Sequence, residues 1–144
     1  MGNTPLRVRS PGVRSLQAND AGRAGALKAA TTFGGIVSSY NYKQPSSFTR
    51  AEQMETPQYA KTSASQAADL TKLLIQYKGI SEGRVLAAGL SSYSSTHAGV
   101  LLFVDQNVSN SVEKTGTANQ PLRVEVSLVR GHGRWLVDNL SVPS

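Results

Sequence analysis

The chain has 144 residues, a length that suits one domain with a hydrophobic core and leaves little room for a second. Hydrophobic residues make up 39% and charged residues 17% of it, a globular composition that excludes disorder of the whole chain. The net charge is +6, but residues 1–14 carry three arginines and no acid, so the remainder holds 12 basic and 9 acidic residues.

The start of the chain carries basic residues and no acid, whereas the rest is nearly balanced in charge, so we expect residues 1–18 to form a flexible arm and residues 19–144 to form the single domain. The absence of cysteine excludes disulfides, thiolate metal sites and a cysteine nucleophile. The most apolar run, Gly99–Val104, is far shorter than the ~18 residues that a membrane-spanning helix needs, so we expect this chain to be soluble.

Three helices are expected in the first half of the domain. The first begins at a cap on Asn19 or Asp20, because either side chain can accept a hydrogen bond from the first turn. Gly34 and Gly35 each cost this helix about 1 kcal/mol relative to alanine, which is tolerable where a neighbouring element packs closely. Its apolar face is predicted to contain Ala26, Ala29, Ala30, Phe33, Ile36, Val37 and Tyr40.

A short second helix is predicted over residues 48–55, with Thr49 and Glu52 as its capping box. A third helix is predicted to begin at Pro57, which suits a first helical turn, and to end at Lys78. The inward stripe of this third helix is expected to contain Tyr59, Ser63, Ala67, Leu70, Leu74 and Tyr77, with Leu73 beside them.

The hydrophobic period changes from 3.6 to 2 after the third helix, which predicts strands. Residues 122–130 alternate apolar and polar side chains, so one face of that strand is buried and the other is wet. The four predicted strands cover residues 84–93, 96–109, 122–130 and 134–142. Three helices followed by a four-stranded meander predict an α+β fold, with the helices packed on one face of an antiparallel sheet.

The sequence contains no motif typical of a metal site, a catalytic nucleophile, a phosphate site or a nucleic-acid interface. His97 and His132 lie on different predicted elements, so no ligand set converges on a metal. There is no Gly-x-Ser-x-Gly motif and no P-loop. The predicted sheet carries few aromatic residues, and Trp135 among them is better interpreted as a core anchor. We therefore expect no metal, no cofactor and no nucleic-acid partner.

Asp105 is the strongest candidate for chemistry. It shares one face of the predicted second strand with His97, Leu101 and Phe103, where apolar neighbours would favour a protonatable carboxyl that acts as a base. The polar residues that follow Asp105 favour a position where the strand reaches solvent instead. The same question arises for Asp138, which we expect to pair with an arginine or to cap the end of the chain.

Three stretches of the sequence resemble the actinobacterial Mce-associated membrane proteins, which are accessory proteins of Mce lipid-import systems. They are "AGVLLFVDQNVSN", "LRVEVSLVR" and "GRWLVDNLSV", and the helix that ends in "SSYNY" matches the start of that family. The resemblance covers residues 19–142. It implies an extracytoplasmic domain of three helices and a curved four-stranded sheet, similar to VirB8 and NTF2-like folds. It also implies a membrane helix, which would lie before residue 1.

The resemblance implies a non-enzymatic accessory domain of an Mce-type lipid transport complex. Such a domain would lie on the extracytoplasmic face of the cell membrane, anchored by a segment absent from this chain. Its partners would be other protein subunits, with a lipid as a further candidate. The surfaces implied are the open face of the sheet and a helix-lined concavity, with candidate core or binding residues Phe33, Tyr40, Tyr77, Phe103 and Trp135.

Two alternatives stay open, because a fold by itself does not give a function. One is a small NTF2-like enzyme of the isomerase or dehydratase type, which would use Asp105 or Asp138 with Tyr40 or His97. The other is a VirB8-like subunit of a conjugation or secretion assembly, which shares the fold but has different partners.

Overall fold

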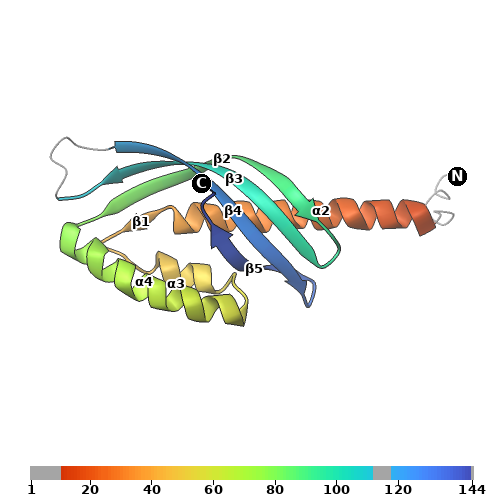
Figure 1. Cartoon of the computed structure of the whole chain (residues 1–144), viewed down its shortest axis with the longest axis horizontal. Helices are drawn as coiled ribbons and strands as arrows, with labels where there is room; N and C mark the ends of the chain where they lie inside the picture. The colour runs from red at the N-terminus through yellow and green to blue at the C-terminus, as the bar shows by residue number, and fades with distance from the viewer. Residues whose placement is uncertain (1–10, 112–117, 144) are drawn as a thin grey trace, which may run out of the picture.

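The structure, a computed structural model, describes residues 11–111 and 118–143 (Figure 1). In this part of the chain the helices are α2 (Pro11–Val37), α3 (Ser47–Glu52) and α4 (Pro57–Tyr77). The strands are β1 (Tyr40–Asn41), β2 (Ile80–Tyr93), β3 (His97–Ser109), β4 (Ala118–Gly131) and β5 (Arg134–Ser141). They form one antiparallel sheet in the order β1-β2-β3-β4-β5. The predicted α+β class is confirmed, and so is the meander order of the four long strands.

The sheet has five strands, not the four predicted. The added strand is β1, in which Tyr40 and Asn41 pair with Ser81 and Ile80 at the start of β2. Tyr40 was predicted to lie on the first helix instead, because a two-residue strand shows no alternation that a pattern can detect. β2 and β4 each begin four residues before their predicted starts, since their pairing with β3 continues through polar residues.

α2 begins at Pro11, not at the predicted cap on Asn19 or Asp20. Residues 11–18, which the sequence analysis assigned to the arm, therefore belong to the helix, and residues 1–10 lie outside the described residues. A proline is well suited to a first helical turn, because its missing N–H is not needed there. Asp20 lies within the helix and faces Arg23 at 3.7 Å, with both side chains exposed. Figure 1 shows α2 extending well past the end of the sheet.

α3 lacks the predicted capping box. Its N-cap is Ser46, whose side chain makes no capping hydrogen bond, and Thr49 lies within the helix. The predicted start of α4 is confirmed, since Thr56 Oγ1 accepts a hydrogen bond from the Tyr59 N–H at 3.2 Å just before the proline of the first turn. α4 ends with Lys78 in the left-handed conformation, at φ 52°.

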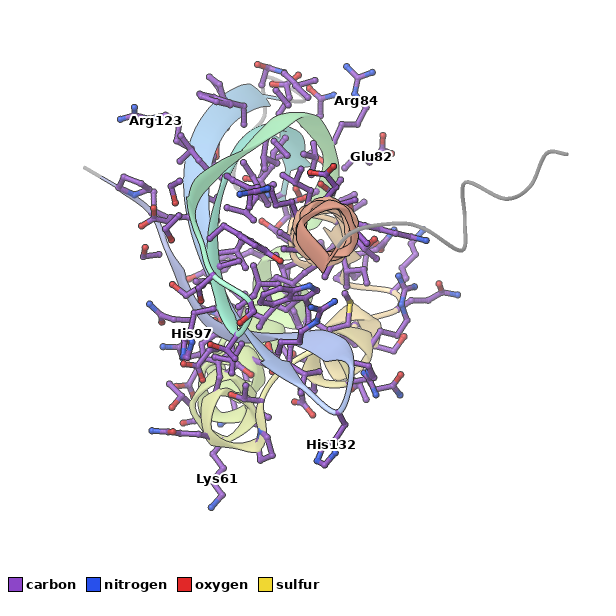
Figure 2. The ribbon with its side chains drawn as sticks, turned by 90° about the vertical axis from the view of Figure 1, so that its right-hand side faces the viewer. Lys61, Glu82, Arg84, His97, Arg123 and His132 are labelled. Carbon is purple, nitrogen blue, oxygen red and sulfur yellow. The ribbon has the colours of Figure 1, made fainter. Side chains whose placement is uncertain are left out.

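The core lies between α2 and the inner face of the sheet, which curves around this helix (Figures 1 and 2). Three residues of the predicted helical face, Ala26, Ala30 and Phe33, are 0–1% exposed. The alternation predicted for the strands is confirmed by the buried side chains of β3, β4 and β5. These are Ala98, Val100, Leu102, Val104, Val124, Val126, Leu128, Trp135 and Val137.

The predicted inward stripe of α4 is confirmed in part, since Tyr59, Ser63 and Ala67 are half-buried and face the sheet, but its C-terminal part is more exposed than predicted. Leu74 is the buried residue of this helix, while Leu70, Leu73 and Tyr77 are 40%, 51% and 41% exposed. Helical spacing identified an apolar face correctly, but spacing cannot say whether another element covers that face. α4 stands away from the core, and this position creates the concavity described below.

The two neighbouring glycines of α2 have different surroundings, which gives a first prediction. A Cβ on Gly34 would lie 2.6 Å from Leu102 Cδ1, whereas a Cβ on Gly35 would meet nothing within 4 Å. We expect Gly35→Ala to raise the free energy of unfolding by up to about 1 kcal/mol, because alanine is the better helix former. We expect Gly34→Ala to lower it by about 1–3 kcal/mol through overpacking. Urea denaturation measures both changes, and shifts of equal sign and size would contradict this packing of α2 on β3.

Candidate functional site

A concavity of about 280 Å³ opens between α4 and the inner face of the sheet, beside the C-terminal part of α2. Most of its wall is apolar, and every layer of the fold contributes to it. The apolar wall consists of Phe33, Val37, Phe48, Ala51, Ala67, Leu70, Val104, Leu122, Val124, Leu140 and Val142. A cleft of this kind, with a few polar groups on an apolar wall, is the usual form of a ligand or partner site.

The junction between α3 and α4 is held against β5 by backbone hydrogen bonds. The Val137 N–H donates to the Met54 carbonyl at 2.8 Å, and the Thr56 N–H donates to the Val137 carbonyl at 2.8 Å. Glu55 lies between these two bonds and forms an isolated bridge with Val137. The pairing therefore fixes the backbone of Glu55 at the edge of the concavity, although the partners are about eighty residues apart in the chain.

Glu55 is the ionisable acid of the concavity wall, and its side chain is 7% exposed. The Ser63 hydroxyl donates a hydrogen bond to Glu55 Oε1 at 2.6 Å. Burial raises the pKa of the Glu55 carboxyl, the hydrogen bond from Ser63 opposes this, and the negative charge of Glu52 adds to it. Burial also raises the pKa of the Tyr59 hydroxyl, and the negative charge of Glu55 raises it further.

A second polar group in the concavity belongs to a buried hydrogen-bond network. Gln106 Nε2 donates to the Ser38 carbonyl at 3.1 Å and to Ser81 Oγ at 3.0 Å, and Ser81 Oγ donates to the same carbonyl at 2.7 Å. These bonds tie the end of α2 to β2 and β3. The polar residues from Asp105 onward predicted that the strand reaches solvent there, but Gln106 points inward and is only 8% exposed.

The predicted catalytic residues do not gather in this concavity. Asp105 and His97 lie on the face of β3 opposite the core, as their predicted common face requires. Figure 2 shows His97 pointing away from α2. Asp138 is exposed on β5 and accepts a hydrogen bond from Thr56 Oγ1 at 2.9 Å, where we expected an arginine or a chain-end cap. Tyr40 packs its ring near that of Phe48, with 6.2 Å between the ring centroids.

Two of these four residues do meet elsewhere. His97 and Asp138 both line a shallow depression of about 240 Å³ whose wall also includes Glu125. The Glu125 carboxylate accepts a hydrogen bond from Ser91 Oγ at 3.1 Å. Within residues 11–111 and 118–143, no three histidine, aspartate or glutamate side chains gather as metal ligands. The second histidine, His132, is exposed in the tight turn between β4 and β5.

Of the predicted core or binding aromatics, Phe33 is the one that lines the concavity. Phe103 is 43% exposed on the opposite face of the sheet, and Tyr77 is 41% exposed on α4. Trp135 is a core anchor, as expected, with 8% of its surface exposed and the Arg130 guanidinium 5.2 Å above its ring. Tyr40 is half-buried beside β2 and does not line the concavity.

Sequence reasoning missed the polar residues that matter most in the concavity. Tyr59 and Ser63 appeared in the predicted stripe of α4, but only as packing residues. Glu55 was assigned to the second helix without any role. A glutamate directly before the Thr56-Pro57 helix start shows that it lies at a junction, but it does not show what covers that junction.

Solved structures provide the comparisons with known proteins. An IcmL-like type IV secretion system protein from Legionella pneumophila is 13% identical, with a TM-score of 0.66 over 84% of this chain and 91% of that chain. CagV from Helicobacter pylori, a VirB8 homologue of a type IV secretion system, is 8% identical, with a TM-score of 0.65 over 84% and 98%. A periplasmic fragment of TraM is 8% identical, with a TM-score of 0.63 over 84% and 96%.

The fold is VirB8-like. At these identities the likeness shows the fold alone. Neither a search with protein-family models nor a search of curated proteins finds a match to the sequence. The assignment to the Mce-associated proteins is not confirmed, since none of these three structures comes from that family. Among the helices described, none combines the length and the apolar character needed to cross a membrane.

Proposed function

We propose that this chain is a non-enzymatic domain of a VirB8-like subunit in a conjugation or secretion assembly, and that it acts through protein–protein contacts. The observation that carries the proposal is the likeness to two type IV secretion system proteins and to a putative transfer protein of a conjugative plasmid, over nearly the whole length of each of those chains. The proposed location is the extracytoplasmic side of a cell membrane, by analogy with the periplasmic TraM fragment.

The exposed apolar face of α4 supports a role in protein contacts. Leu70, Leu73 and Tyr77 follow one another at helical spacings of three and four, and each is at least 40% exposed. We call these three residues the α4 stripe. An apolar stripe of this kind on an otherwise polar helix is typical of a surface that another protein covers. The proposed occupant is another subunit of the same assembly.

A charge placed on the α4 stripe tests this role, because an interface tolerates a buried unpaired charge poorly. In a strain that lacks the gene, we expect the full-length protein with Leu73→Glu to restore DNA transfer or secretion at least about tenfold less well than the wild type. Lys72→Glu is the matched control, since it adds a negative charge at an exposed neighbouring position of the same helix. Both variants should keep the wild-type circular dichroism spectrum.

Equal activity of the two variants would contradict the role of the α4 stripe. Loss of lipid uptake, with normal transfer and secretion in the deletion strain, would contradict the assembly proposal and favour the Mce-type transport complex. Lipid uptake should therefore be measured with a labelled lipid in the same strains. The Mce interpretation stays a prediction until that measurement.

A further inference from the structure

The concavity holds a buried acid without a countercharge. Its wall contains Glu55 and no lysine, arginine or histidine among the described residues, although the chain as a whole is basic. Glu55 Oε1 accepts the hydrogen bond from Ser63, while no hydrogen bond or ion pair within the described residues involves Oε2. A carboxylate in an apolar setting is costly unless a positive group pairs with it.

The elements around Glu55 do not supply that positive group. Glu52 on α3 and Asp138 on β5 are acids, and Tyr59 on α4 is a neutral phenol at ordinary pH. The cations of these elements are Arg50 on α3, Lys61 and Lys72 on α4 and Arg134 on β5, and none of them forms an ion pair with Glu55 among the described residues. Arg134 donates a hydrogen bond to the Gln53 carbonyl at 3.3 Å instead. A positive group can therefore reach Glu55 from the open side of the concavity.

We propose that the concavity binds a small apolar molecule that carries one protonated amine, with Glu55 as its countercharge. The apolar wall, which includes Phe33, Phe48 and Val104, would hold the hydrocarbon part. An ammonium group has three N–H donors. Glu55 Oε2 accepts one of these hydrogen bonds. Tyr59 and Gln66, which both lie on α4, line the concavity as further acceptors.

Charge and size limit what fits. A fatty acid would bring a second carboxylate beside Glu55, so the wall selects against it. A volume of about 280 Å³ lies at the lower end of the range for small-molecule sites, which excludes a large ligand from the enclosed part. This site is independent of the proposed assembly role. Leu73 and Tyr77 of the α4 stripe do not line the concavity, and Leu70 is the member of the stripe that does.

Hexylamine is the probe ligand, and 1-hexanol and hexanoate are comparison ligands with the same chain length. We expect isothermal titration at neutral pH to give hexylamine a Kd at least about tenfold lower than that of 1-hexanol, and hexanoate the weakest binding. Amide chemical shifts in NMR should change at Gln66 and Gln106, which line the site. Glu55→Gln should abolish the preference for the amine, while Glu52→Gln, which changes an acid outside the wall, should keep it.

The affinity of the concavity for hexylamine should depend on pH in a defined direction. The pKa of Glu55 is raised above its ordinary value of 4.5, so the carboxyl takes up its proton before most others as the pH falls. Hexylamine stays protonated throughout, so its affinity should fall on acidification through that pKa while the affinity for 1-hexanol stays constant.

The same raised pKa means that the folded protein loses stability as the pH rises through it. Glu55→Gln removes this loss and should be at least as stable as the wild type at neutral pH.

Several outcomes would overturn the proposal. These are equal affinities for hexylamine and 1-hexanol, tighter binding of hexanoate, or an unchanged amine preference in Glu55→Gln. Tighter binding of a short lysine-containing peptide than of hexylamine would assign the site to a protein partner and would equally overturn it. None of these results depends on DNA transfer or secretion, so this test and the test of the assembly role can fail separately.

Discussion

Replacement of Phe33 by alanine is expected to lower the free energy of unfolding by about 3–5 kcal/mol. The ring is 1% exposed and is among the largest fully buried side chains of the described residues. It also forms part of the concavity wall, so its removal joins a new void in the core to the existing concavity. Domains of this size are typically stable by about 5–15 kcal/mol, so this loss is a large fraction of the total free energy of unfolding. Urea denaturation followed by far-UV circular dichroism measures the change.

Phe103→Ala is the matched control for this prediction. Phe103 is 43% exposed on the opposite face of the sheet, so its replacement should cost less than about 1 kcal/mol. The two variants remove the same atoms from the same residue type, and only the face differs. A larger loss for Phe103→Ala than for Phe33→Ala would mean that the assignment of the two faces is wrong.

The second large effect is expected for Gly83→Ala on β2. A Cβ at this position would overlap Ser38 Oγ and Cβ and would lie 2.8 Å from the Ser38 carbonyl oxygen. This carbonyl cannot easily move, because it accepts the hydrogen bonds from Ser81 Oγ and Gln106 Nε2. Gly83 itself exchanges hydrogen bonds with Ser39, at 3.0 Å to its N–H and 3.2 Å to its carbonyl. We expect Gly83→Ala to lower the free energy of unfolding by about 3 kcal/mol, in the upper part of the usual range for overpacking.

Gly89→Ala tests whether this loss comes from the contact with Ser38 or simply from a substituted glycine. Gly89 lies on the same strand, and a Cβ there would meet nothing within 4 Å. We expect its free energy of unfolding to differ from that of the wild type by less than about 0.5 kcal/mol in the same urea experiment. A loss as large as that of Gly83→Ala would contradict the argument from Ser38.

The hydrophobic periods of the sequence were sufficient to find most of the fold. A period of 3.6 identified the buried face of α2, and a period of 2 identified the buried faces of β3 and β4. These patterns are local, since each residue's face follows from its neighbours in the chain. β1 escaped detection because its strand character comes only from pairing with β2. The early start of α2 escaped because Asn19 and Asp20 favour a cap and do not require one.

The candidate site was much less predictable, because its key residue gains its properties from distant parts of the chain. Glu55 is buried because two backbone hydrogen bonds hold the α3–α4 junction against Val137 on β5: the Met54 carbonyl accepts from the Val137 N–H, and the Thr56 N–H donates to the Val137 carbonyl. The α4 stripe shows the same limit in the opposite direction, because its apolar spacing correctly predicted a helix but wrongly predicted burial.

The sequence by itself therefore determined the α+β class, the order of the elements and which side chains share a face. These properties follow from short-range periodicity and backbone preferences. Only the tertiary structure decided which apolar faces are covered and which carboxylate is buried: Asp105 and Asp138 line no part of the concavity, and Glu55 lies in its wall. The reason is that burial, and with it the cost of a charge, depends on surfaces brought together across the whole chain.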